Sequence, residues 1–188
     1  MTTSAPLSPM MMQWHACKQE AGDALLLFRL GDFFEAFYED AELLAKELDL
    51  TLTKRHTIPM SGIPVHTGES YIDRLVAKGY RVAVAEQVED SRAAKGLVKR
   101  EIVRIVTPGT VINSSLLSDK SNNFLVCITQ LNHTFGLAIL DLTTAEFRAL
   151  QLDTLNELLN ELATLSPSEI LLSEKCAKII LEKNSIIM

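Results

Sequence analysis

The sequence predicts an α/β (α+β) protein built from two structural units. Three observations lead to this fold class. Apolar runs of strand length alternate with segments whose apolar residues recur at helical spacing. A segment without such periodicity interrupts them midway, and three strand-like runs follow it in succession. The 188 residues are 47% hydrophobic and 22% charged, which suffices for one or two globular domains. We expect one domain over residues 1–107 and another over 124–188, with a linker at 108–123.

The first elements are a helix and a buried strand. A helix is predicted over residues 8–22, which begin with Ser-Pro, a good N-cap and first helical residue, and end with Gly. Leu25–Leu30 is a continuous apolar run of strand length, and a Gly-Asp pair breaks it. From about Phe34 to Leu48 the apolar residues fall on one helical stripe, which predicts a second helix.

The next elements complete the first domain. Residues 51–68 are rich in Pro, Gly, Thr and basic residues and have no helical period, so we expect a loop, or a short strand followed by a loop. Glu69–Lys78 is predicted to be a helix that stops at Gly79. The valine-rich alternation of Tyr80–Val88 indicates a strand, and Ile102–Val106 is predicted to be another after a polar, basic connection.

The second half begins with a change of composition. Pro108–Asn123 has no period and much Ser and Asn, which is typical of a linker. The runs FLVCITQ, FGLAILDLT and AEFRALQ then predict an antiparallel meander with short turns. A helix over roughly Thr154–Leu165, a strand at Ile170–Leu172 and a further helical stretch follow. We expect this second unit to be incomplete.

The charge of the chain restricts how it could hold nucleic acid. A net charge of −6 argues against binding through a broad basic surface. Residues 1–107 carry 13 basic and 15 acidic side chains, and residues 108–188 carry 5 and 9. A contact with DNA would therefore have to be local and to depend on shape.

Membrane, signal and cysteine patterns point to the cytoplasm. No run approaches the roughly 18 consecutive apolar residues of a membrane helix, and no signal peptide is recognisable, so we expect no membrane partner and a cytoplasmic location. The three cysteines are odd in number and far apart. They predict buried or half-buried thiols rather than disulfides or metal ligands.

The segment RLGDFFEAFYEDA lies at the expected junction of strand and helix. Asp32 and Glu35 could form a D-x-x-E capping box, in which case the phenylalanines would belong to the core. On the helical stripe, however, Phe33 lies about 70° off the axis at ~100° per residue and has no obvious core role. The residues alone leave a capping box and a functional site both open.

Several blocks in the first half, taken together, resemble the mismatch-recognition domain of the bacterial MutS family. They cover about residues 8–112 in one colinear run: SPMMMQW, LLLFRLGDFFEAFYEDA, LDLTLTKR, IPMSGIPVHTGESYIDRLVAKGYRVAVAEQVED and KGLVKREIVRIVTPGT. Residues 124–188 are similar to the start of the family's connector domain. The resemblance implies a mixed-sheet recognition domain followed by part of a ribonuclease-H-like connector, at the N-terminus of a longer protein.

The family's mark is Phe-x-Glu, here Phe33 and Glu35, with Phe34 where many members have tyrosine. The resemblance implies that Phe33 enters the minor groove of mismatched double-stranded DNA and stacks on a mispaired or unpaired base. It implies that Glu35 hydrogen-bonds that base. We expect Glu35 to be repelled by intact duplex and to take up a proton at a mismatch, because burial and neighbouring negative charge raise a carboxyl pKa.

Supporting contacts follow from position within the matching blocks. Lys54 and Arg55 match residues that meet phosphates, although solvated loop charges are the alternative. Met60 and Ser61 match a loop that lines the minor groove beside the wedge, with ordinary packing as the alternative for Met60. The basic residues between 92 and 100 could touch the DNA backbone or simply be solvated.

The chain is not expected to be an enzyme in its own right. It has no G-x-x-x-x-G-K-[ST] phosphate loop, so we expect no cofactor here. The resemblance implies ATP and Mg in a separate C-terminal domain, and a homodimer that recruits MutL. Two alternatives remain: a metal-dependent nuclease, for which Asp141 would need partner carboxylates, and an interaction domain that does not touch DNA.

Overall fold

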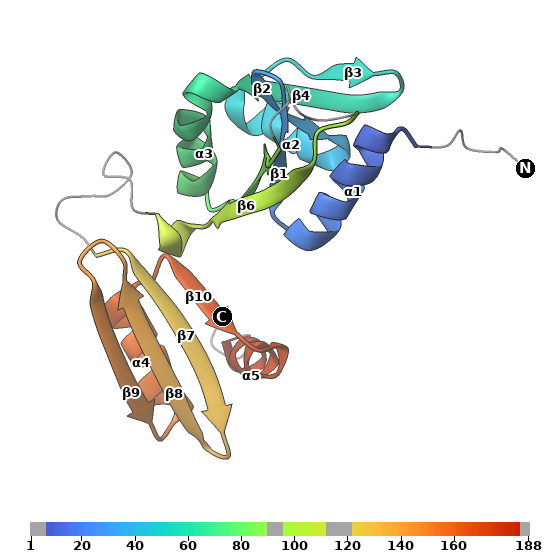
Figure 1. Cartoon of the computed structure of the whole chain (residues 1–188). Coiled ribbons are helices and arrows are strands. Elements are labelled where there is room, and N and C mark those ends of the chain that lie inside the picture. Colours follow the sequence, from blue (N-terminus) through green and yellow to red (C-terminus); the bar gives the residue numbers. More distant parts are fainter. Residues whose placement is uncertain (1–6, 90–95, 112–121, 185–188) are drawn as a thin grey trace, which may run out of the picture. The chain divides into compact units, whose positions relative to one another are not determined.

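The structure is a computed structural model that describes residues 7–89, 96–111 and 122–184. It divides into two compact units, Met1–Thr107 and Pro108–Met188. Each unit combines a β-sheet with α-helices (Figure 1). The predicted fold class is therefore confirmed.

The first unit is built on a six-stranded mixed sheet. Its strands are β1 (Leu25–Leu30), β2 (Phe33–Phe37), β3 (Thr53–Arg55), β4 (Ile58–Pro64), β5 (Val82–Gln87) and β6 (Arg100–Val106). The strand order is β3-β4-β2-β1-β5-β6. β1 pairs in parallel with β5 and antiparallel with β2, and β4 pairs antiparallel with β2 and β3. The central position of β1 explains its continuous apolar run, because both of its faces are covered.

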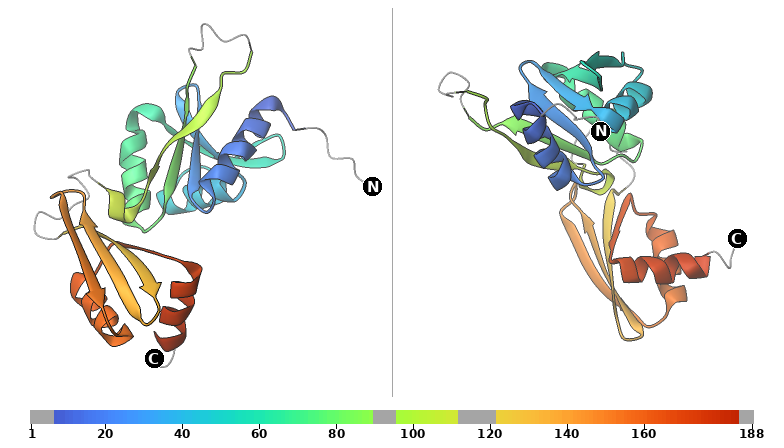
Figure 2. Two further views of the ribbon diagram at one scale, coloured as in Figure 1. Left: turned by 60° about the horizontal axis from the view of Figure 1, so that its bottom comes forward. Right: turned by 90° about the vertical axis from the view of Figure 1, so that its right-hand side faces the viewer.

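Three α-helices complete this unit. They are α1 (Pro9–Ala21), α2 (Tyr38–Leu48) and α3 (Gly68–Ala77), with a short 3-10 helix η1 (Val65–Thr67) before α3. α1 begins and ends as predicted, because the Ser8 side chain accepts a hydrogen bond from the Met11 amide and Gly22 follows its last residue at φ 62°. α1 packs with Phe28 and Phe37 on one face of the sheet, whereas α2 and α3 cover the other (Figures 1 and 2).

Two predictions in this unit are wrong. Phe33–Phe37 is a strand and not the start of a helix, so α2 begins only at Tyr38 and has no capping box. Apolar residues three apart suit a helix, but pairing with both β1 and β4 holds this segment extended. The predicted loop at 51–68 contains β3 and β4, whose prolines at positions 59 and 64 concealed the strand pattern.

The second unit is built on a four-stranded sheet with the order β10-β7-β8-β9. Its elements are η2 (Pro108–Thr110), β7 (Phe124–Leu131), β8 (Thr134–Asp141), β9 (Glu146–Leu152), α4 (Leu155–Leu165), β10 (Glu169–Leu172) and α5 (Glu174–Asn184). The predicted antiparallel meander is confirmed as β7-β8-β9, and Thr154 caps α4 in a capping box with Glu157. Of the predicted linker, residues 112–121 lie outside the described part of the chain.

The helices α4 and α5 cover one face of this second sheet. Val126, Leu137 and Ile139 form its core with Leu158 of α4, and Ile180 of α5 packs against them. The strand register puts the side chains of Leu125, Leu140 and Phe147 in one row on the opposite face.

The cysteine prediction is right for two residues and wrong for one. Cys17 and Cys176 are buried, but Cys127 is exposed because it lies on the face of the second sheet that α4 and α5 leave uncovered. Among the described residues, no helix is long and apolar enough to cross a membrane.

Candidate nucleic-acid interface

Phe33 lies at the tip of a tight hairpin between β1 and β2. Leu30 pairs with Phe33, so Gly31 and Asp32 form a two-residue turn, and Gly31 takes the φ of 61° that such a turn favours. The carbonyl of Asp32 accepts a hydrogen bond from the Val65 amide at 2.9 Å, which ties the turn to the end of β4. The hairpin tip is therefore held by the sheet.

Phe33 is the exposed aromatic of its strand. It is 47% exposed, whereas Phe34 and Phe37 are buried at 3% and 0%. The expectation that Phe33 lies outside the core is confirmed, but the reason differs from the predicted one. Side chains alternate across a strand, so Phe34 points to the α2–α3 side and Phe33 to the side that α1 covers only in part.

The face around Phe33 is defined by the cross-strand pairs of β2 and β4. Phe33 stands opposite Pro64, Glu35 opposite Gly62, and Phe37 opposite Met60. We call the surface of Phe33, Glu35, Met60, Gly62 and Pro64 the β2–β4 face. Helix α1 contacts β1 and β6 on this side of the sheet, and the five residues are exposed or half-buried.

Glu35 is a half-buried carboxylate with an unsatisfied oxygen. Its Oε2 atom is shielded from solvent and has no hydrogen-bond partner within the described residues. Burial raises the pKa of Glu35, and the positive charge of Arg55 lowers it by less. An unpaired buried oxygen costs about 1–3 kcal/mol. Glu35 Oε2 could therefore bind a proton or accept a hydrogen bond from a partner outside the chain.

The two predicted phosphate contacts leave the sheet in different directions. Lys54 and Arg55 are both exposed on β3. Arg55 pairs with Ile58, which puts its side chain on the same side of the sheet as the β2–β4 face, whereas Lys54 pairs with Pro59 on the opposite side. Arg55, and not Lys54, is therefore the cation that shares a face with Glu35.

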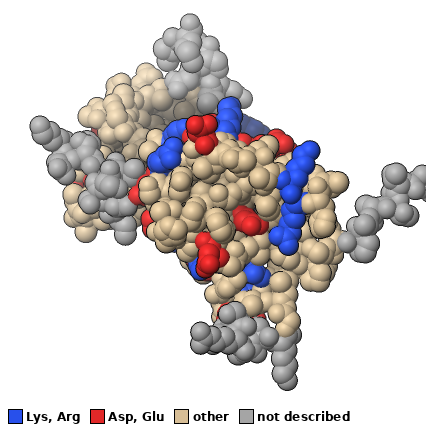
Figure 3. All heavy atoms as spheres, turned by 90° about the horizontal axis from the view of Figure 1, so that it is seen from above, with Lys and Arg blue, Asp and Glu red and all other residues tan. Residues whose placement is uncertain are grey.

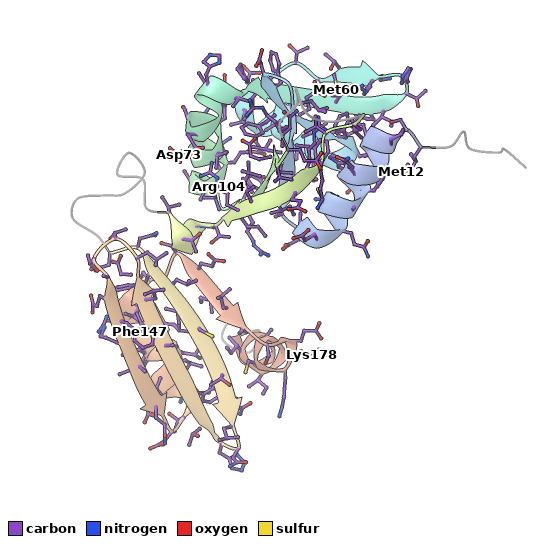
Figure 4. All side chains as sticks on the ribbon, viewed as in Figure 1. Met12, Met60, Asp73, Arg104, Phe147 and Lys178 are labelled. Carbon is purple, nitrogen blue, oxygen red and sulfur yellow. The ribbon has the colours of Figure 1, made fainter. Side chains whose placement is uncertain are left out.

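Met60 and Ser61 lie on strand β4 and not in a loop as predicted. Met60 is half-buried on the β2–β4 face, where Figure 4 labels it. Ser61 points to the other side, is 2% exposed and donates its hydroxyl hydrogen to the Thr51 carbonyl at 3.3 Å. The structure thus brings Met60, Glu35 and Phe33 to one face and gives Ser61 a contact within the fold.

A surface hollow beside Phe33 contains residues that the sequence analysis missed. It is lined by Arg29, Asp32, Phe33, Pro64, Val65 and His66. The cationic group of Arg29 lies over the Phe34 ring at 5.7 Å and also pairs with Glu86. No local signal could have identified Pro64 or His66, because only the pairing of β2 with β4 brings them next to the hairpin.

The basic residues near position 100 make contacts within the fold. Arg100 is buried and donates hydrogen bonds to the carbonyls of Arg29 at 2.6 Å and Val98 at 2.7 Å. Lys99 forms an ion pair with Glu101. The basic residues at 92 and 95 lie outside the described part of the chain. On the face turned upward in Figure 1, Lys and Arg gather in a few separate places among mostly uncharged residues (Figure 3).

Asp141, the carboxylate considered for a nuclease, is fully buried at the end of β8. Burial alone would raise its pKa, but hydrogen bonds from Thr143, Asn122 and Asn123 outweigh burial and lower the pKa to about 2. The described residues contain no group of three or more His, Cys, Asp or Glu that could hold a metal ion. This geometry gives no support to the nuclease alternative.

Comparisons with known proteins identify both units. Residues 8–115 match the family model of MutS domain I, and residues 123–187 match that of MutS domain II. The chain is 68% identical to the DNA mismatch repair protein MutS of Protochlamydia amoebophila over 169 residues, which are 90% of this chain and 20% of that protein. It is 51% identical to the MutS protein of Chlamydia abortus over 179 residues, 94% of this chain and 22% of that protein. The chain thus spans about a fifth of the length of these curated relatives.

Proposed function

This chain belongs to the MutS family, and we propose that it is a reading head for mismatched double-stranded DNA in DNA mismatch repair. The observation that carries the proposal is that an exposed phenylalanine shares a strand face with a carboxyl group, one oxygen of which has no hydrogen-bond partner among the described residues. Phe33 is held at a fixed hairpin tip, and Glu35 lies two residues further along the same face of the same strand.

Phe33 acts in this proposal as an apolar wedge in the minor groove. A wedge between base steps costs a few kcal/mol in lost stacking and kinks the duplex. Stacking of a base on the ring returns roughly 1–3 kcal/mol. At a mispaired or unpaired base part of the stacking is already lost, so the deformation costs less there than in matched DNA. Discrimination then depends on how easily the DNA deforms at the mispaired base. It does not need broad electrostatic attraction, which suits a chain of net charge −6.

Glu35 acts as a hydrogen-bonding partner of the displaced base. As a carboxylate it is repelled by the phosphates of an intact duplex. At a mismatch, the raised pKa favours the protonated carboxyl, which can donate to a base acceptor. The buried Oε2 atom has no hydrogen-bond partner among the described residues, and in this proposal the presented base supplies one.

The remaining contacts flank this pair. Arg55 meets a phosphate on the wedge side of the sheet, and Lys54 meets the backbone from the opposite side. Met60 contributes apolar surface to the minor groove. Ser61, whose hydroxyl is bonded to Thr51, contributes through the position of β4 and reaches DNA only if that bond is exchanged.

The matched relatives are about five times as long as the part of them that this chain covers, so further functions are proposed for a protein of their full length. We propose that ATP and Mg bind outside this chain, that the protein works as a homodimer that recruits MutL, and that it is cytoplasmic and associated with the nucleoid. This chain contributes binding and not catalysis.

Fluorescence anisotropy on matched, G·T-mismatched and single-base-loop duplexes tests the proposal. Salt is held constant, because phosphate contacts depend on it. The wild-type chain is compared with Phe33→Ala and with Phe147→Ala, a control at an exposed phenylalanine of the second unit. Phe33→Ala should lose roughly 5- to 150-fold of the preference for the defective duplexes, the equivalent of 1–3 kcal/mol, and Phe147→Ala should retain it. Equal affinity of the wild type for all three duplexes, or preference retained in Phe33→Ala, would overturn the proposal.

A further inference from the structure

We infer that Gly62 is a positioning residue for Glu35, because its lack of a side chain leaves space beside β4 for the Glu35 side chain. This inference rests on the proposed function of Glu35. Gly62 belongs to the neighbouring β-strand β4, and in this inference it affects DNA binding only through Glu35.

The contacts around Gly62 would crowd a methyl group. Gly62 is the cross-strand partner of Glu35. A Cβ atom at Gly62 would come within 3.3 Å of Glu35 Cγ, 3.1 Å of the Phe34 carbonyl oxygen and 3.7 Å of Glu35 Cα. The first two distances are tighter than ordinary van der Waals contact. The Glu35 side chain thus lies against the bare backbone of Gly62.

The backbone of Gly62 does not itself require glycine. Gly31 has a positive φ of 61°, which favours glycine, whereas Gly62 lies in the extended part of a regular strand. Glycine weakens a strand and often marks the close approach of another group. At position 62 the approaching group is the side chain of Glu35.

Strand β4 cannot easily retreat to make room. Ser61 and Ile63 flank Gly62 and are 2% and 0% exposed on the other side of the sheet. The strand also pairs with β2 on one edge and β3 on the other, and Thr53 Oγ1 donates to the Met60 carbonyl at 3.0 Å. A methyl group at position 62 would therefore press on two neighbours: the Phe34 carbonyl oxygen, which belongs to the backbone of β2, and Glu35 Cγ. Of these two, only the Glu35 side chain can move away by rotation, so we expect it to be displaced while β2 shifts slightly at Phe34.

Displacing Glu35 would change how it meets a base. The Oε2 atom is shielded from solvent and unpaired among the described residues. Rotation of the side chain away from β4 would move this oxygen from its shielded position toward water, which would then satisfy it. The carboxyl would lose the fixed direction and the unsatisfied state that the proposed contact with DNA requires.

A double-mutant cycle on binding tests the inference. Gly62→Ala, Glu35→Ala and the double variant are titrated against matched and G·T duplexes, with Gly68→Ala as the control, since a Cβ there would crowd the Phe34 ring at 3.1 Å and not Glu35. Gly62→Ala should lower the preference for the mismatch about three- to tenfold, the range of one lost hydrogen bond. In the Glu35→Ala background the same change should have no further effect.

The outcomes separate the inference from the proposed function. If Glu35→Ala leaves the preference unchanged, the proposed role of Glu35 fails. If Glu35→Ala lowers the preference but Gly62→Ala does not, or lowers it equally in both backgrounds, Gly62 does not act through Glu35. A nuclear Overhauser effect between Gly62 Hα and Glu35 Hγ in the wild-type chain gives a test that does not depend on the folding of any variant. The inference predicts that it is present, and its absence would contradict the packing described.

Discussion

Each unit has an exposed phenylalanine and, close to it in sequence or in strand register, a buried or half-buried carboxyl group, and the two carboxyl groups differ in their hydrogen bonding. In the first unit Phe33 is 47% exposed and lies two residues from Glu35. In the second unit Phe147 on β9 is 66% exposed (Figure 4) and stands opposite Leu140, next to Asp141. Asp141 accepts hydrogen bonds from three neighbouring residues, whereas Glu35 keeps an oxygen without a partner in the described part of the chain.

Exposure alone is therefore not the criterion that singles out Phe33 as the proposed binding residue. By exposure, Phe147 would be the better candidate. Its polar neighbours are nevertheless satisfied: Arg148 pairs with Glu146 at 2.8 Å and its cation lies over the Phe124 ring at 5.6 Å. An unsatisfied polar group beside an exposed ring, as at Phe33, is the combination that a partner would complete.

The largest expected effect concerns stability and separates Phe33 from its buried neighbour. Phe34→Ala should lower the free energy of unfolding by about 3–5 kcal/mol, since it empties a core position. Phe33→Ala should change it by no more than about 0.5 kcal/mol. Urea unfolding followed by the fluorescence of Trp14, the single tryptophan and part of the first unit, measures both. Equal destabilisation by the two variants would mean that Phe33 packs as a core residue, and this would contradict its proposed role as an exposed wedge.

The next effect concerns the two carboxyl groups. Asp141→Asn should destabilise the second unit by about 1.5–3 kcal/mol, the value of a hydrogen bond to a charged group. Because the pKa of Asp141 is lowered from 3.8 to about 2, its contribution is present above pH 3.8 and is lost as the pH falls toward 2. Hydrogen exchange of β7 and β8 at pH 7, 4 and 2.5 measures the stability of the wild type and of Asp141→Asn. A stability difference between them that did not decrease on acidification would contradict this prediction.

Glu35 should show the opposite pH dependence. Because burial raises its pKa above 4.5, its contribution to stability is present below pH 4.5 and is lost as the pH rises through the raised pKa. The stability of the wild type relative to Glu35→Gln should therefore fall between pH 4 and pH 7, as followed by Trp14 fluorescence. If this relative stability rose between pH 4 and pH 7, Glu35 would be hydrogen-bonded as a carboxylate. The carboxyl groups of the two units would then not differ in their hydrogen bonding.

The smallest expected effect concerns the cations of β3. Lys54→Ala should weaken binding to matched and mismatched duplexes alike, by about two- to fivefold, as expected of one exposed phosphate contact. Arg55→Ala should also change the preference for the mismatch, since Arg55 lies on the side of Glu35 and lowers its pKa. Anisotropy titrations of both variants measure this, and identical behaviour would show that the division between the two faces has no consequence for binding.

Local signals were sufficient to predict much of the fold. The cap at Ser8, the apolar run of β1, the helix α3 that ends before Gly79 and the β7-β8-β9 meander depend on residues close in sequence. The strand β2 was missed because its extended conformation depends on pairing with both β1 and β4, and β4 lies about 25 positions further along the chain.

The candidate site was proposed from family resemblance, and the sheet register shows which of its residues share a face. The residues alone left Phe33 and Glu35 undecided between a capping box and a binding site. The strand register puts the side chains of Lys54 and Arg55 on opposite faces of the sheet and pairs Gly62 with Glu35. Neither result follows from spacing along the chain.

Site-specific photo-crosslinking would reveal which residue of the chain contacts a mispaired or unpaired base. The chain is prepared with p-benzoylphenylalanine at position 33 or at position 147 and irradiated with duplexes that carry one G·T mismatch or one unpaired base. We predict that position 33 crosslinks at the mispaired or unpaired base and its immediate neighbours, and that position 147 gives no such product. Crosslinks from position 33 spread evenly along the duplex, or equal yields at the defect from both positions, would contradict the assignment of Phe33 as the residue that reads the mismatch.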